Sequence, residues 1–203
     1  MLSHLVIALS SSLLFTTSLA APLRLKSRAT TCSPQPDPPI STEISPLVDR
    51  DYVWTMFADD AGTTQNVSIA FAHIEYETTN PYATRIDFGF TRVDGTNDQY
   101  RLEFPKGNGV SECLAAASSS QVLSAPCTSD TTSWTIECST CEDESERCLI
   151  KSTKYQTCAI VDSDLLVALG DCPSIDDLPT EIGDPFSDVP IESLVGNQAW
   201  RVL

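Results

Sequence analysis

Two cysteine-bounded segments of equal length decide how this chain folds: residues 113–127 read CLAAASSSQVLSAPC and residues 158–172 read CAIVDSDLLVALGDC. In each segment a valine, Val122 or Val167, stands nine residues after the first cysteine, and the second cysteine follows five residues later. The two segments are offset by 45 residues. This regularity predicts an internal repeat.

The residues before these segments predict β-strands, because apolar and polar residues alternate with a period of two. Asp94-Gly95 supplies the turn of a hairpin between two such strands. The alternating residues are Val67, Ile69, Phe71 and His73; Ile86, Phe88 and Phe90; and Tyr100, Leu102 and Phe104. Short strands are also predicted at 122–123, 134–136, 165–169 and 200–203. No segment has a sustained helical period, so the predicted fold class is all-β, and His73 is expected to face the core.

The N-terminal residues 1–20 form an apolar run that ends in Ser18-Leu19-Ala20, which is typical of a signal peptide cleaved after Ala20. A membrane anchor is the alternative, but serine and threonine interrupt the run and no basic residue precedes it. We therefore expect a secreted, extracellular protein. Residues 21–50 include a Pro-, Ser- and Thr-rich stretch and are predicted to be an extended N-terminal arm, followed by one domain over 51–203.

Export changes how the eight cysteines are interpreted, because an oxidising compartment favours disulfides over thiolate metal sites. The repeat predicts the bridges Cys113–Cys127 and Cys158–Cys172, since equal loops in repeated strands bring equivalent cysteines together. The other four cysteines are Cys32, Cys138, Cys141 and Cys148. We expect Cys32 to tie the arm to the acidic turn that holds the other three, with the pairing left open. Zinc binding or redox chemistry at this turn is disfavoured, because its acidic residues disfavour thiolates.

Charge and composition exclude several classes of partner. The chain has 28 acidic and 12 basic residues, a net charge of -16, and 41% hydrophobic residues. Nucleic acids and anionic membranes need a positive surface, so neither is an expected partner. The only histidines are His4 and His73, and removal of the leader leaves one. We expect no metal and no cofactor; the oligomeric state is left open.

Three tryptophans are each followed, after one residue, by an aliphatic residue: Trp54-Thr-Met, Trp134-Thr-Ile and Trp200-Arg-Val. The last is part of Asn197-Gln198-Ala199-Trp200, a Q-x-W element. With the two cysteine-bounded segments, these residues resemble the ricin B-type lectin family, whose repeats of about 40 residues end in Q-x-W. The resemblance covers about half the chain. It implies a β-trefoil-like barrel with disulfide-stapled loops and a glycan or cell-surface glycoconjugate as partner, without catalysis.

The resemblance also implies a sugar site in the last repeat. Family members use an acidic residue shortly after the first cysteine, an aromatic platform and the asparagine of N-Q-x-W. Asn197 matches that asparagine, but Ile160 and, in the middle repeat, Ala115 occupy the acidic position, so Asp162 or Asp164 is expected to substitute. We expect an exposed amide at Asn197. Trp134 and Trp200 are interpreted as core residues and Gln198 as a structural hydrogen-bonding residue.

Two other functions remain open at this point. A structural or interaction protein of the cell surface that keeps the fold and has lost sugar binding fits the missing carboxylates equally well. A glycoside hydrolase needs only two suitably placed carboxylates, and 28 acidic residues are available, but the chain has no G-x-S-x-G element and we nominate no catalytic residue.

Two further features are predicted to lie on the surface. Residues 173–194 carry four prolines and six acidic residues; this stretch is interpreted as a solvated insertion, with a calcium-binding or recognition loop as the less favoured alternative. Asn66-Val67-Ser68 is an N-glycosylation acceptor. It is expected just before the first strand, so we predict glycosylation of Asn66 in a eukaryotic source.

Overall fold

The computed structural model describes residues 31–34, 41–42, 44–47, 52–58, 65–71, 83–85, 88–106, 110–141, 145–180 and 194–202. Every strand pairing in this part of the chain is antiparallel. The only described helix is the single 3₁₀ turn η1 (Ile175–Asp177). The predicted all-β class is therefore confirmed.

The strands, in chain order, are β1 (Ser41–Thr42), β2 (Ile44–Pro46), β3 (Tyr52–Ala58), β4 (Gln65–Phe71), β5 (Ala83–Arg85), β6 (Phe88–Arg92), β7 (Gln99–Lys106), β8 (Val110–Ala116), β9 (Val122–Ala125), β10 (Trp134–Glu137), β11 (Thr140–Cys141), β12 (Ser145–Ser152), β13 (Cys158–Val161), β14 (Val167–Gly170) and β15 (Trp200–Val202).

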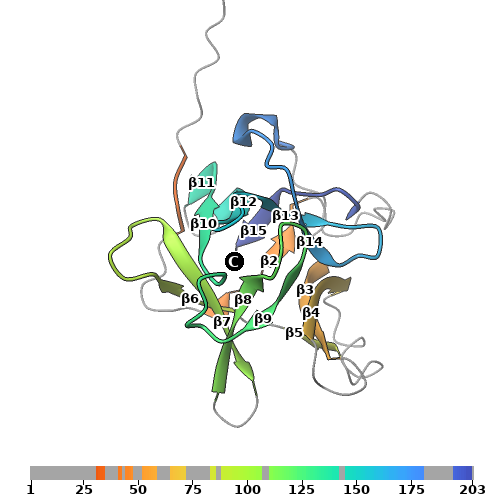
Figure 1. The fold of residues 1–203 in the computed structure, drawn as a ribbon. Coiled ribbons are helices and arrows are strands. Elements are labelled where there is room, and N and C mark those ends of the chain that lie inside the picture. Colours follow the sequence, from red (N-terminus) through yellow and green to blue (C-terminus); the bar gives the residue numbers. More distant parts are fainter. Residues whose placement is uncertain are drawn as a thin grey trace, which may run out of the picture.

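The sheet curls because six strand pairings follow one another in a cycle. β2 pairs with β15, β15 with β12, β12 with β10, β10 with β7, and β7 with β6. β6 then pairs with β1, which a single residue separates from β2. Figure 1 shows β2, β10, β12 and β15 beside one another around the middle of the molecule.

Three hairpins lie outside this cycle: β3–β4, β8–β9 and β13–β14. They also contact one another, because Asn66 of β4 pairs with Leu123 of β9, and Gln121 forms a bridge with Ala168 of β14. Twelve of the fifteen described strands can be grouped into three sets of four, here called units, and β1, β5 and β11 lie outside these sets. In each unit the first and fourth strands belong to the cycle and the second and third form the hairpin; the units are β2, β3, β4 and β6; β7 to β10; and β12 to β15.

The fourth strand of each unit begins with a fully buried aromatic residue, which is Phe88, Trp134 or Trp200. Trp54, expected to be the first copy of the tryptophan motif, lies instead in β3, the second strand of its unit. That expectation was wrong because Phe88 takes the equivalent position. Trp54 packs edge-on against Phe88 and Trp200, with ring centroids 5.9 and 5.0 Å apart.

The second and third units repeat the same hydrogen bonds at equivalent positions, which confirms the internal repeat. The indole Nε1 of Trp134 donates to the carbonyl of Leu114 (2.9 Å), and that of Trp200 donates to the carbonyl of Ala159 (3.2 Å). Both acceptors directly follow the first cysteine of their segment. Two backbone hydrogen bonds are also repeated. The bond from Ala116 N to Thr131 O in the second unit is equivalent to the bond from Val161 N to Asn197 O in the third. Likewise, the bond from Ala117 N to Gln121 O is equivalent to the bond from Asp162 N to Leu166 O.

The alternating residues of two predicted strands point into the core. Phe88 and Phe90 of β6, and Tyr100, Leu102 and Phe104 of β7, are all buried. Asp94-Gly95 forms the turn between these strands, and Gly95 has a φ of 80°, which favours glycine. The predicted β6–β7 hairpin is thus confirmed. His73 lies outside the described residues.

Four disulfides close loops of the sheet, and no described cysteine is free. The predicted bridges Cys113–Cys127 and Cys158–Cys172 are both present, each with a sequence separation of 14. Cys32 pairs with Cys141, as expected for a tie between the arm and the acidic turn, and Cys138 pairs with Cys148.

Part of the predicted N-terminal arm belongs to the folded domain. Ile44, Ser45 and Leu47 are fully buried, and β2 pairs with β15. β2 therefore joins the sheet although it lies in the segment 21–50 that was predicted to be the arm, and Pro46 is tolerated because it lies at an edge position. Nearer the N-terminus, Cys32 exchanges two backbone hydrogen bonds with Cys138.

In the described ends of the segment 173–194, Ile175, Leu178 and Leu194 are buried, whereas most of the other described residues are exposed. Arg147 stands at an irregularity in β12 with a φ of 52°, and its Nη2 donates to the carbonyls of Ile175 (3.2 Å) and Leu178 (3.0 Å). Ile175 and Leu178 cover an apolar cluster that includes Leu47 and Leu149. Residues 181–193 lie outside the described residues.

Candidate functional site

The backbone of Asn197 lies beside the end of β13, next to the loop that carries the two candidate carboxylates. Gly196 N donates to the carbonyl of Val161 (2.8 Å), and Val161 N donates to the carbonyl of Asn197 (3.1 Å). Val161 directly precedes Asp162. The structure thus places the backbone of Asn197 within one residue of Asp162, although the two residues are 35 positions apart in the chain.

The side chain of Asn197 turns back into its own segment. The residue is only 8% exposed, and its Nδ2 donates to the carbonyl of Ala199 at 2.9 Å. The expectation of an exposed amide was therefore wrong. The physical reason is local: the chain between Leu194 and β15 must bury its polar groups, and the amide satisfies one of them.

Asp162 organises the β13–β14 loop. Its Oδ1 accepts hydrogen bonds from the backbone N–H groups of Asp164 and Leu166, both at 2.9 Å. These bonds hold a tight turn in which Leu165 adopts a φ of 60°, an unusual conformation for a branched side chain. Asp164 is exposed at the tip of the turn. Of the two candidate carboxylates, one therefore shapes the loop and the other faces solvent.

Gln198 connects β15 to the end of the neighbouring hairpin. Its Nε2 donates to the carbonyl of Asp171 at 2.7 Å. A Cβ added at Gly170 would lie 3.4 Å from Ile160 and 3.6 Å from Gln198 Nε2. The side chains of Gln198 and Ile160 thus lie next to Gly170. The hydrogen bond from Gln198 to Asp171 O agrees with the structural role expected for Gln198. Trp134 and Trp200 are both fully buried.

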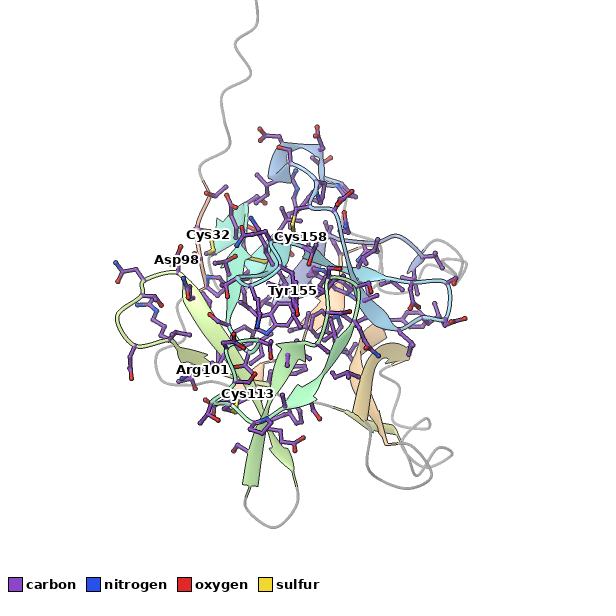
Figure 2. The ribbon with its side chains drawn as sticks, viewed as in Figure 1. Cys32, Asp98, Arg101, Cys113, Tyr155 and Cys158 are labelled. Atoms are coloured by element: carbon purple, nitrogen blue, oxygen red, sulfur yellow. A yellow bond between two sulfur atoms is a disulfide. The ribbon has the colours of Figure 1, made fainter. Side chains whose placement is uncertain are left out.

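Three other chain connections meet at a surface between the second and third units, here named the Tyr155 surface. Its residues are Ala117 and Ser118 after β8, Asp130 and Thr131 before β10, and Lys154 and Tyr155 after β12. Figure 2 shows Tyr155 near the centre of the view. The sequence analysis did not single out these residues, because they are widely separated in the chain and belong to no motif.

An ion pair links two of these connections. Lys154 Nζ lies 2.7 Å from Asp130 Oδ2, and the side chains are 39% and 77% exposed. The hydrogen bond to Asp130 raises the pKa of Lys154 above its ordinary value, so the lysine stays charged at neutral pH. An exposed pair of this kind contributes little to stability.

A second ion pair is half-buried. The side chain of Arg201 is 1% exposed and that of Glu146 is 22% exposed, and Arg201 Nε lies 3.3 Å from Glu146 Oε1. The pair joins β15 to β12, so we assign it a structural role.

The described residues contain one group of three potential metal-ligand side chains, formed by Glu103, Cys113 and Cys127. Both sulfurs belong to a disulfide and offer no thiolate, so this group does not fit a thiolate metal centre.

No protein-family model matches the chain, and a search of curated proteins found no match. In the described part of the chain, no helix is long and apolar enough to cross a membrane.

Proposed function

We propose that the protein is a β-trefoil of the ricin B type. The cycle of six strands and the three hairpins outside it support this proposal, because a trefoil consists of three such four-strand units. The repeated indole hydrogen bonds of Trp134 and Trp200 further support it. Four disulfides are consistent with an extracellular protein, and secretion through the leader at 1–20 is part of the proposal.

We further propose that it binds carbohydrate and is not a catalyst, with a glycan or a cell-surface glycoconjugate as the partner. One observation carries this proposal: Asn197-Gln198-x-Trp200 occupies, in the third unit, the position at which Trp134 stands in the second, with the same indole hydrogen bond. The resemblance of this motif and of the proposed trefoil scaffold to lectins supports the proposal.

A second candidate is an extracellular structural or interaction protein that keeps the scaffold without binding sugar. The internal bonds of Asn197 and Asp162 favour it, because both groups expected to hold a sugar hydroxyl already have protein partners. Asp164 is the candidate site residue that remains exposed.

A glycan array probed with the full secreted protein separates the two candidates. The proposal expects binding to at least one immobilised glycan, and weak affinity for the matching monosaccharide, about millimolar, as for a shallow site with few buried contacts. Absence of binding across the array overturns the carbohydrate proposal in favour of the second candidate. Release of sugar from chromogenic glycosides, measured in parallel, would contradict a non-catalytic role.

A further inference from the structure

Each of the two repeated disulfides has a charged residue directly across the sheet from its first cysteine, and the two charges are opposite. In the second unit, Glu103 of β7 pairs with Cys113 of β8. In the third unit, Lys151 of β12 pairs with Cys158 of β13. Directly opposed residues of an antiparallel pair point to the same face of the sheet, with Cβ atoms about 4.5–5.5 Å apart. The two bridges therefore lie in different electrostatic environments.

In other respects the two bridges are matched. The second-unit bridge (Cys113–Cys127) and the third-unit bridge (Cys158–Cys172) each have a sequence separation of 14. In both bridges the first cysteine is fully buried and the second is half-buried. A reductant must therefore attack Cys127 in one bridge and Cys172 in the other. Access to the sulfur does not distinguish the two bridges, so the neighbouring charge does.

Glu103 lies close to both sulfurs of the second-unit bridge. A carboxylate oxygen of Glu103 and the sulfurs of Cys113 and Cys127 all lie within 4.8 Å of one another. On its other side, Glu103 pairs with Gly89 of β6, and the glutamate is half-buried. Partial burial lowers the effective dielectric constant around a charge, so the carboxylate acts more strongly on the sulfurs than it would in bulk water.

Other charged groups near the bridges do not remove this difference. Arg101 is two residues before Glu103 on the same face of β7 and lies near Cys113 in Figure 2, but in the described chain no ion pair joins Arg101 to Glu103. Asp171 directly precedes Cys172. Among the described residues, however, no carboxylate lies within 4.8 Å of both sulfurs of the third-unit bridge.

Reduction of a disulfide by a dithiol passes through anionic sulfur. A thiolate of the dithiol attacks the half-buried sulfur, the S–S bond breaks, and the buried cysteine leaves as a thiolate with the electron pair. The second sulfur of the dithiol then displaces the half-buried cysteine from the mixed disulfide. The dithiol is oxidised to a disulfide, and its two protons pass to the two cysteines. A nearby carboxylate disfavours each anionic step, and a nearby ammonium group favours it.

We propose that the repeated disulfides are a redox-sensitive pair, in which Glu103 protects the second-unit bridge from reduction by dithiols and Lys151 promotes reduction of the third-unit bridge. The third-unit bridge is thus the first of the two to open. This inference does not depend on the proposed carbohydrate-binding function.

Opening of the third-unit bridge affects the segment that contains the Q-x-W element. Gln198 Nε2 donates to the carbonyl of Asp171, the residue before Cys172. Cys172 is tied to β13 through its disulfide with Cys158. Reduction removes this covalent tie and leaves the β13–β14 hairpin to its four backbone pairs. The part of the third unit that Gln198 contacts is therefore the part that reduction loosens.

The test measures the initial rate at which each bridge is reduced when the full secreted protein is treated with dithiothreitol. Samples are alkylated at intervals, and peptide mapping follows the label on Cys113, Cys127, Cys158 and Cys172. In wild type we expect the third-unit bridge to be reduced about tenfold faster than the second-unit bridge, the size of effect that one unit charge a few Å away produces at partial burial.

Two charge-removing variants test the two neighbours separately. Glu103→Gln keeps the shape of the side chain and is expected to speed reduction of the second-unit bridge about tenfold, with the third-unit bridge unchanged. Lys151→Gln is expected to slow reduction of the third-unit bridge about threefold, with the second-unit bridge unchanged. Each variant is thus the matched control of the other. Asp98→Asn, at an exposed position well apart from Cys113 in Figure 2, controls for net charge and leaves both rates unchanged.

Equal rates for the two bridges in wild type, or earlier reduction of the second-unit bridge, would overturn the inference. A ratio of rates that neither variant changes would also overturn it. The melting temperature of each oxidised variant is compared with that of wild type first. If a variant is unfolded, the wild-type ratio is measured from about 10 mM to about 1 M sodium chloride: screening is expected to lower the ratio, and a constant ratio contradicts the proposal.

Discussion

The side chain of Asn197 hydrogen-bonds a residue only two positions away in the chain. Asn197 matches the asparagine of the N-Q-x-W motif, but its Nδ2 donates to the carbonyl of Ala199, and the residue is 8% exposed. Removing one partner of a buried hydrogen bond leaves the other unsatisfied. The consequence is a stability role, which a sequence motif cannot distinguish from ligand binding.

Asn197→Ala is therefore expected to destabilise the protein by about 1–2 kcal/mol, because Ala199 O loses its donor. In a domain of this size the melting temperature falls by about 2–6 °C. Differential scanning calorimetry measures the change. The control is Asp164→Ala at an exposed position, expected to stay within about 0.5 kcal/mol. An unchanged melting temperature for Asn197→Ala would restore the view of a free amide.

Trp200 tests the equivalence of the three units. Trp200→Ala removes a fully buried indole and is expected to cost about 3–5 kcal/mol. Trp200→Phe keeps an aromatic ring, as Phe88 does at the equivalent position of the first unit, and loses chiefly the bond to Ala159 O, so a smaller loss is expected. Urea unfolding measures both. Equal losses for the two substitutions would argue against the equivalence of Phe88 and Trp200.

Asn66 lies within β4, where it pairs with Phe57 and with Leu123, and not before the first strand as expected from the sequence. Glycosylation of Asn-x-Ser requires that the side chain be reached by the transferase before or after folding. We still predict a glycan at Asn66 in the protein secreted by a eukaryotic host. The intact mass of the secreted protein, measured before and after treatment with a glycan-releasing amidase, tests for this glycan. An unchanged mass would contradict the prediction. The variant Asn66→Gln, which cannot carry a glycan at this position, gives the mass of the unmodified protein.

At the scale of strands, the alternation of apolar and polar residues predicted the β6–β7 hairpin, but the sequence did not predict that β2 belongs to the sheet. Phe88 to Phe104 formed the expected hairpin because its two strands are adjacent in the chain and one turn joins them. β2 was expected in an irregular arm, yet it pairs with β15 at the far end of the chain. Pairing between remote strands depends on which edges remain open after the local hairpins form.

The disulfides differ in how deeply they are buried. Cys113, Cys158, Cys138 and Cys148 are fully buried, so three bridges contain at least one inaccessible residue, whereas Cys32 and Cys141 are both only half-buried. Reduction requires access of a thiolate to a sulfur. The Cys32–Cys141 bridge has two half-buried cysteines, whereas Cys113–Cys127 and Cys158–Cys172 have one each and Cys138–Cys148 has none, so the Cys32–Cys141 bridge is expected to be reduced first.

Titration of the native protein with dithiothreitol, followed by alkylation and peptide mapping, measures this order. Label on Cys32 and Cys141 should precede label on the other six cysteines, while the far-ultraviolet spectrum stays native, because β2 and β15 remain paired. Simultaneous labelling of all eight would contradict the prediction. Cys32→Ser with Cys141→Ser serves as the control, since it removes the early step alone.

For the whole molecule, charge opposes compactness. A net charge of -16 on 203 residues repels itself in the folded state more than in the extended chain. Raising sodium chloride from about 10 mM to about 300 mM screens this repulsion and is expected to raise the melting temperature by a few degrees. Thermal unfolding followed by circular dichroism measures the shift. A melting temperature that falls with salt would show that attractive pairs such as Lys154–Asp130 outweigh the net repulsion.

The sequence alone predicted those features that depend on residues close to one another in the chain. Period-two alternation predicted the all-β class and the β6–β7 hairpin, and the equal spacing of Cys113 and Cys127, Cys158 and Cys172 predicted two disulfides. In each case the residues involved lie within about 20 positions, where chain geometry leaves few alternatives.

The folded chain was needed for features that join distant residues. The cycle of strands through β1, β2 and β15, the pairing of Cys32 with Cys141 and the meeting of Asp130, Lys154 and Ala117 around Tyr155 all bring together remote segments. The placement of the Asn197 backbone belongs here too, because Val161 N donates to the Asn197 carbonyl and so joins this segment to β13. Long-range contacts follow from packing of the whole sheet, and no local pattern encodes which side chains then face solvent.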